Sequence, residues 1–79
     1  MNEKKILEKI IKIFSEITEE SIITEESELI DDLGLSSIDV FTALADLEDA
    51  FNIVIPEKMV RQMVTIEDVK NIVKKLMRS

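Results

Sequence analysis

Residues 36–51 form the stretch that decides the fold, and their sequence is SSIDVFTALADLEDAF. Ser36 and Asp39 have the spacing of a capping box, with Asp in place of the usual Glu, so a helix is predicted over residues 37–51 with Ser36 as its N-cap. One side of this helix carries an apolar stripe of the kind that a bundle buries. The stripe consists of Val40, Ala43, Leu44, Leu47, Ala50 and Phe51.

The opposite side of this predicted helix is not purely polar, as a side that meets only water should be. Near the helix start it carries Ile38 and Phe41, and apolar residues rimmed by charge suggest a contact surface for a partner. The other residues of this side are Ser37, Thr42, Ala45, Glu48 and Asp49. Alternatively, residues 16–35 fold over this side and bury it. A competing interpretation of Phe41 places its side chain inside the bundle.

Three further helices are predicted around this one. Residues 3–15 place their apolar side chains on one broad arc at helical spacing. Thr65 and Asp68 form a second capping box, which predicts a last helix over residues 66–77 with Thr65 as its N-cap. A short helix over residues 57–62 is expected after Pro56. The predicted fold is all-α: a small four-helix bundle with three main helices, one short third helix and a long first loop, forming one domain over residues 1–79.

The long loop spans residues 16–35 and is rich in Glu, Ser and Thr. Loops of this length are uncommon and often functional. We expect Ile22, Ile23, Leu29 and Ile30 to pin it to the core, residues 27–30 to form one helical turn, and Gly34 to lie at a tight turn.

Composition removes several kinds of chemistry. The 79 residues include no His, no Cys and one Gly. The chain therefore lacks the usual base near neutral pH, thiol catalysis, disulfides, thiolate zinc sites and a glycine-rich phosphate cradle. A self-sufficient enzyme is not expected. No targeting segment or long apolar run is visible, which predicts a cytoplasmic protein without membrane insertion.

Charge is distributed unevenly along the chain, whose formal net charge is −7. Residues 13–57 hold thirteen acids and no base, which argues against nucleic acid as a partner and favours basic partner surfaces. The alternative is a solvated acidic surface that aids solubility. Asp31 and Asp32, with Asp39 near them, are the candidates for a weak cation site, although they lack the ligand spacing of an EF-hand loop.

Ser37 lies in the first turn of the predicted helix, where free backbone N–H groups and the positive end of the helix dipole favour a phosphate. A Ser at a helix start is more often a cap than a modification site. The run Asp32-Leu33-Gly34-Leu35-Ser36-Ser37-Ile38-Asp39 nevertheless resembles the signature of the acyl carrier protein family, in which a leucine–glycine pair precedes an Asp-Ser-Leu core. The similarity continues through residues 47–51, 53–56 and 65–69.

This resemblance implies a carrier rather than a catalyst. In the family, a phosphopantetheinyl transferase attaches 4′-phosphopantetheine from coenzyme A to the serine that Ser37 matches, and acyl groups ride on its thiol as thioesters. The bundle interior can shelter the acyl chain. Partners would be acyl-transferring and synthase enzymes with basic docking surfaces, and the chain would be a monomer. The expected docking residues are Ile38, Asp39, Phe41, Thr42, Ala45, Glu48 and Asp49.

The sequence departs from the family pattern at several positions. Ser36 stands where an Asp is usual, and Ile38 replaces Leu. Lys58 and Arg61 fall in the short third helix, where fatty-acid carriers usually present acids. These departures leave open a general fatty-acid carrier or one dedicated to polyketide, aminoacyl or specialised lipid synthesis. Other hypotheses are an unmodified, carrier-like acidic interaction module and an acidic helical cation sensor.

Overall fold

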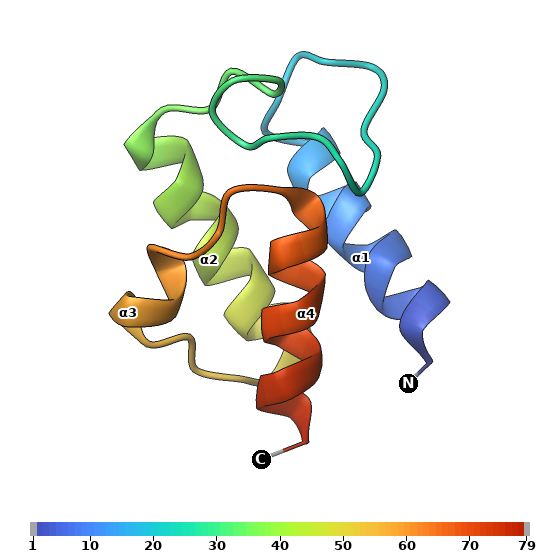
Figure 1. The fold of residues 1–79 in the computed structure, drawn as a ribbon, viewed down its shortest axis with the longest axis vertical. Coiled ribbons are helices and arrows are strands. Elements are labelled where there is room, and N and C mark those ends of the chain that lie inside the picture. Colours follow the sequence, from blue (N-terminus) through green and yellow to red (C-terminus); the bar gives the residue numbers. More distant parts are fainter. Residues whose placement is uncertain (1, 79) are drawn as a thin grey trace.

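The computed structural model describes residues 2–78, and four helices follow one another in this range (Figure 1). They are α1 (Glu3–Ser15), α2 (Ser37–Phe51), α3 (Glu57–Val60) and α4 (Ile66–Met77). Helix α1 packs against both α2 and α4. The predicted all-α fold is therefore confirmed, and the short third helix ends at Val60, two residues earlier than predicted. A turn of backbone bonds spanning three residues, such as Met63 N–H to Val60 C=O, replaces its expected end.

The core is built from the apolar stripes of the three main helices. Helix α1 contributes Ile6, Ile10 and Phe14, α2 contributes Ala43, Leu44, Leu47 and Phe51, and α4 contributes Ile66, Val69, Ile72 and Val73. The α2 stripe departs from the prediction at two positions, since Val40 is half-buried and Ala50 is exposed. Ala50 is next to last in the helix, which ends at Phe51.

Both predicted capping boxes form. The Ser36 Oγ accepts a hydrogen bond from the Asp39 backbone N–H at 3.2 Å, and the Ser36 N–H donates to Asp39 Oδ2 at 3.0 Å. Thr65 and Asp68 make the corresponding pair of bonds at the start of α4. These bonds satisfy donors that a helix start otherwise leaves unpaired, and they fix where α2 and α4 begin.

The long loop packs against the segment that precedes α4 instead of forming a helical turn at residues 27–30. Glu28 pairs with Thr65 in an isolated antiparallel bridge, and the Leu29 N–H donates to the Val64 C=O at 2.9 Å. Because this pairing uses the backbone groups that a helical turn would need, the predicted turn is wrong; a tight turn follows over residues 29–33. Gly34 has a φ of +65°, which confirms the turn expected there.

Two of the four residues expected to pin the loop to the core do so. Leu29 is buried and Ile23 packs on the core in a half-buried position, whereas Ile22 and Ile30 are exposed. Leu33 and Leu35 complete the buried set from this segment. The loop is therefore held against the start of α4, where the Ile66 N–H donates to the Ser27 C=O, and it leaves the outer side of α2 uncovered.

Lys70 of α4 is buried, with 7% of its surface exposed, and it joins three separate parts of the chain. Its Nζ forms an ion pair with Glu25 of the loop and a second with Glu3 of α1 at 3.1 Å. Lys74 Nζ also contacts Glu3, at 2.9 Å. Hydrogen bonds from Lys74 and then Lys70 lower the pKa of Glu3, and the hydrogen bond to Glu25, followed by that to Glu3, raises the pKa of Lys70.

This ion-pair network predicts how stability responds to acid. A carboxyl group whose pKa is lowered by folding stabilises the protein above its ordinary pKa of 4.5, and this contribution is lost as the pH falls through the lowered value. The Lys70→Met substitution keeps the apolar stem but removes the charge. The substitution should lower the melting temperature at pH 7. It should also make the melting temperature fall less below pH 4.5, because Glu3 then has Lys74 as its remaining ion-pair partner. Lys5→Met, at an exposed lysine, is the control; equal acid profiles for both variants would contradict the network's role.

Candidate functional site

Ser37 is the first residue of α2 and its side chain lies on the surface. The neighbouring Ser36 hydroxyl is engaged in the cap, as described above. Within residues 2–78, by contrast, the Ser37 hydroxyl has no protein hydrogen-bond partner. Of the two adjacent serines, therefore, one is used by the fold and the other is free for chemistry.

The backbone around Ser37 suits an attached phosphate. In the described part of the chain, the amide N–H groups of Ser37 and Ile38 have no protein acceptor, because they precede the first intrahelical bond, from Val40 N–H to Ser36 C=O. These amides and the positive end of the α2 dipole stabilise a negative group placed beside them. An exposed hydroxyl at this point also leaves room for an extended group. The residues present therefore fit a phosphate ester on Ser37.

An apolar hollow of about 230 Å³ opens beside Ser37. The remaining lining residues are Leu29, Ile30, Val40, Phe41, Val60 and Met63. Ile30, Val60 and Met63 were not predicted to belong to the site. The available signal was the spacing of three between Val60 and Met63 after Pro56. No sequence signal pointed to Ile30, which was expected in the core and is 58% exposed.

The outer side of α2 is open. Ile38 is 75% exposed and Phe41 is 66% exposed, so the alternative in which residues 16–35 bury this side is wrong. Thr42, Ala45 and Asp49 are exposed as well. Two of the expected docking carboxylates have partners within the chain. Asp39 Oδ2 accepts from the Ser36 N–H, and Glu48 Oε2 accepts from the Ile55 N–H at 2.8 Å.

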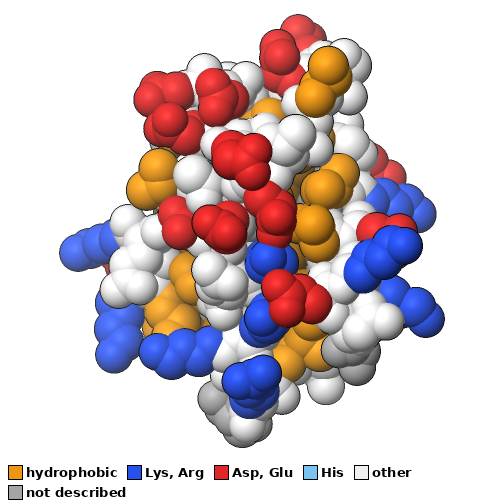
Figure 2. All heavy atoms as spheres, turned by 45° about the vertical axis from the view of Figure 1, so that its right-hand side comes forward, with side chains coloured by type: hydrophobic (Ala, Val, Ile, Leu, Met, Phe, Trp, Pro, Cys, Tyr) orange, Lys and Arg blue, Asp and Glu red, His pale blue; other side chains and the backbone are white. Residues whose placement is uncertain are grey.

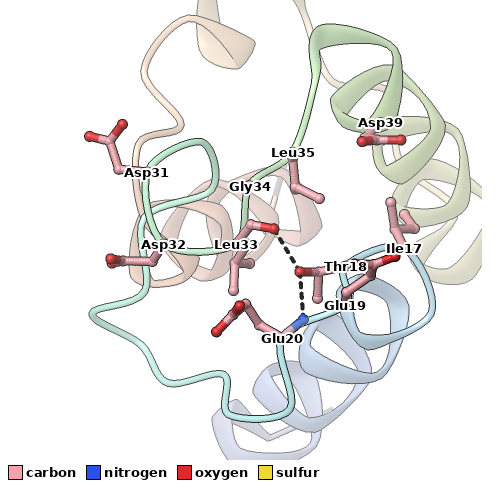
Figure 3. A pocket seen from close by; sticks show the side chains of 10 residues that line it. All are labelled: Ile17, Thr18, Glu19, Glu20, Asp31, Asp32, Leu33, Gly34, Leu35 and Asp39. Atoms are coloured by element: carbon pink, nitrogen blue, oxygen red, sulfur yellow. Dashed lines mark hydrogen bonds between the residues drawn. The ribbon is translucent and has the colours of Figure 1, made fainter.

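A polar hollow of about 490 Å³ lies between the long loop and the start of α2 (Figure 3). Thr18 shapes it by donating to the Leu33 C=O at 2.7 Å and accepting from the Glu20 N–H. Its acidic lining residues are Glu19, Glu20, Asp31, Asp32 and Asp39.

The expected weak cation site at Asp31, Asp32 and Asp39 is not supported. Among residues 2–78, no three acidic side chains are arranged to hold a metal ion. Asp31 and Asp32 lie on the loop, and Asp39 lies across the hollow on α2 (Figure 3). Asp32 Oδ2 accepts from the Glu28 N–H at 2.8 Å, and Asp39 is committed to its cap, so both carboxylates serve the backbone.

Charge divides the molecule along its length. In Figure 2, the Asp and Glu side chains crowd the upper part of the face shown, where the long loop lies, and Lys and Arg dominate the lower part, toward the two ends of the chain. The acidic end is also the end at which α2 starts. Ser37 therefore lies in a negative field that attracts basic surfaces.

Self-repulsion within this acidic end predicts a response to salt. Raising NaCl from about 0.01 M to about 0.15 M shortens the screening length from about 30 Å to about 8 Å, so the melting temperature should rise. Magnesium chloride at the same ionic strength should produce the same rise, because within residues 2–78 no three acidic side chains are arranged to hold a metal ion. Thermal unfolding followed by circular dichroism measures both. A markedly larger rise with magnesium would show specific binding, and no rise with either salt would contradict the self-repulsion.

Comparisons with known proteins indicate the family to which the chain belongs. The sequence profile of a family described as "phosphopantetheine attachment site" matches residues 8–73. An acyl carrier protein of Borreliella burgdorferi is 36% identical over 77 residues, covering 95% of this chain and 96% of the relative. An acyl carrier protein of Campylobacter lari is 37% identical over 60 residues, 76% of this chain and 78% of the relative.

A similar structure has also been solved. A candidate acyl carrier protein from Mycobacterium tuberculosis superimposes with a TM-score of 0.72 at 33% identity, covering 92% of this chain and 95% of that one. The fold and the site thus define a carrier of covalently attached 4′-phosphopantetheine. The chain belongs to the acyl carrier protein family. Members of this family interact with transferase and synthase enzymes. None of the helices within residues 2–78 is both long enough and apolar enough to cross a membrane.

Proposed function

We propose that Ser37 is the residue to which 4′-phosphopantetheine is attached, and that the chain carries acyl groups without catalysing their transfer. The observation that carries this proposal is the contrast between the two adjacent serines. The Ser36 hydroxyl is held in the capping box, whereas the Ser37 hydroxyl is exposed in the first turn of α2.

The attachment needs little from the chain itself. The Ser37 Oγ bonds to the phosphorus that bears the pantetheine of coenzyme A, the bond from this phosphorus to adenosine 3′,5′-bisphosphate breaks, and a base of the transferase takes the hydroxyl proton. The α2 amides of Ser37 and Ile38 then stabilise the charge of the resulting phosphodiester. This protein has no cysteine and therefore no thiol of its own. The bound group supplies the thiol, which holds an acyl group as a thioester.

The outer side of α2 is the proposed docking surface. Ile38 and Phe41 form its apolar centre, because they are the large apolar side chains that α2 leaves exposed. Thr42, Ala45 and Asp49 surround them, and the acidic field of this end selects basic partner surfaces and speeds encounter. Asp39 and Glu48, which bond to the backbone of this chain, support the surface more than they bind a partner.

The partners proposed on this basis are a phosphopantetheinyl transferase and the acyl-transferring and synthase enzymes of fatty-acid or related synthesis. Residues 1–79 would act there as one monomeric domain in the cytoplasm. The net charge of −7 argues against nucleic acid as a further partner.

Mass spectrometry tests the attachment. The unmodified chain is incubated with coenzyme A and a phosphopantetheinyl transferase, its intact mass is measured, and the modified peptide is fragmented. The expected result is one added phosphopantetheine on Ser37. A group found on Ser36 would overturn the assignment. A chain that stays unmodified, both here and when isolated from its native host, would favour an acidic interaction module.

A further inference from the structure

Two neighbouring hollows lie along the groove between α2 and α3. The first, of about 230 Å³, includes Ser37 in its lining, and the second, of about 560 Å³, includes Leu44 and Glu48. Phe41 of α2 and Val60 of α3 line both hollows. These two shared side chains therefore form the boundary between them.

The order of residues along α2 places this boundary close to Ser37. Ser37, Phe41 and Glu48 lie on the outer side of α2, and Leu44 belongs to its buried stripe; along the helix these four residues are spaced by three or four positions. Each helical turn advances about 5.4 Å, so Phe41 lies about one turn from Ser37 and precedes the second hollow. Phe41 lines both hollows, although it is 66% exposed and most of its surface meets solvent.

The two hollows differ in chemistry. Apart from Ser37, the first is lined by apolar side chains, whereas the lining of the second includes Glu48, Glu57 and Arg61. When the arm attached to Ser37 folds back on the protein, the acyl group at its far end is therefore sheltered better in the first hollow than beside these charges. An enclosed apolar cavity of about 150 Å³ can hold benzene, so this open hollow of about 230 Å³ covers an apolar group of roughly eight carbons at most.

We propose that Phe41, with Val60 opposite it, limits the length of the acyl group that this carrier shelters, and that its cargo is a short acyl chain. This inference rests on the attachment at Ser37 proposed above. Phe41 then acts as a specificity-determining residue: it closes the hollow beside Ser37, and longer chains must leave their ends in water.

The test compares acyl groups of increasing length on the same carrier. Butanoyl, octanoyl, dodecanoyl and hexadecanoyl groups are loaded with their phosphopantetheine from the matching coenzyme A thioesters, loading is verified by intact mass, and the melting temperature is measured. In the unaltered sequence, the temperature should rise from butanoyl to octanoyl and then stop rising. In Phe41→Ala, which joins the two hollows, it should keep rising to dodecanoyl.

Two further variants make the result specific. Phe41→Leu retains a bulky side chain and should retain the limit. Val54→Ala removes an apolar side chain that is 78% exposed and lies in neither lining, so it should behave like the unaltered sequence. Three outcomes would overturn the inference. In the unaltered sequence, the melting temperature could keep rising up to hexadecanoyl, or none of the acyl groups could raise it. In Phe41→Ala, the melting temperature could stop rising at octanoyl as it does in the unaltered sequence. Failure to load, seen directly as an absent mass increase, would overturn the proposed attachment and this inference with it.

Discussion

Replacing Ser37 by Ala should abolish phosphopantetheine transfer while leaving the fold intact. The Ser37 hydroxyl is exposed and makes no protein hydrogen bond within residues 2–78, so its removal leaves no buried group unpaired. Surface changes of this kind usually alter the free energy of unfolding by no more than about 0.5 kcal/mol. Intact mass after incubation with coenzyme A and transferase should show no addition, and thermal unfolding should match that of the unaltered chain.

The adjacent Ser36 provides a matched control for this result. Ser36→Ala removes the hydroxyl that accepts the Asp39 N–H, which should cost about 0.5–2 kcal/mol of unfolding free energy as a lost N-cap. It should still accept one phosphopantetheine. The two neighbouring substitutions thus have opposite expected effects, one on chemistry and one on stability. A modified Ser37→Ala chain, or an unmodified but folded Ser36→Ala chain, would contradict the assignment of roles.

The features that local sequence determines were predicted well. Each capping box depends on two residues three positions apart, and each buried stripe depends on helical spacing, so the starts of α2 and α4 and most of the core followed from short stretches of sequence. The positive φ of Gly34 belongs to the same class, since it depends on one residue type at a turn.

The features that depend on distant partners were not predicted. Lys70 lies on the buried side of α4, but nothing near it in sequence indicates that Glu3 and Glu25 come within reach of its ammonium group. The bridge between Glu28 and Thr65 displaced an expected helical turn for the same reason. The hollow beside Ser37 also requires Val60 to face α2 across the groove, and that depends on how a helix of four residues packs.

The structure also decides between two locations for Phe41 that the sequence left open. Its exposure places it on the outer side of α2 and not in the core, although its ring lines two surface hollows. An outer position makes Phe41 available to a partner enzyme as well as to the cargo. The difference between an exposed and a buried phenylalanine can be measured within this chain, because Phe14 of α1 is 1% exposed and serves as the reference.

Phe14→Ala should therefore lower the free energy of unfolding by about 3–5 kcal/mol, the usual cost of deleting a buried aromatic ring and leaving a cavity. Phe41→Ala should change it by no more than about 0.5 kcal/mol, because water already covers most of the ring. Urea unfolding followed by circular dichroism gives both values. The same Phe41→Ala chain should accept phosphopantetheine more slowly than Val54→Ala, since its docking surface has lost its aromatic anchor. A loss of several kcal/mol for Phe41→Ala, with an unchanged transfer rate, would mean that the ring supports the bundle in solution and that partners dock elsewhere.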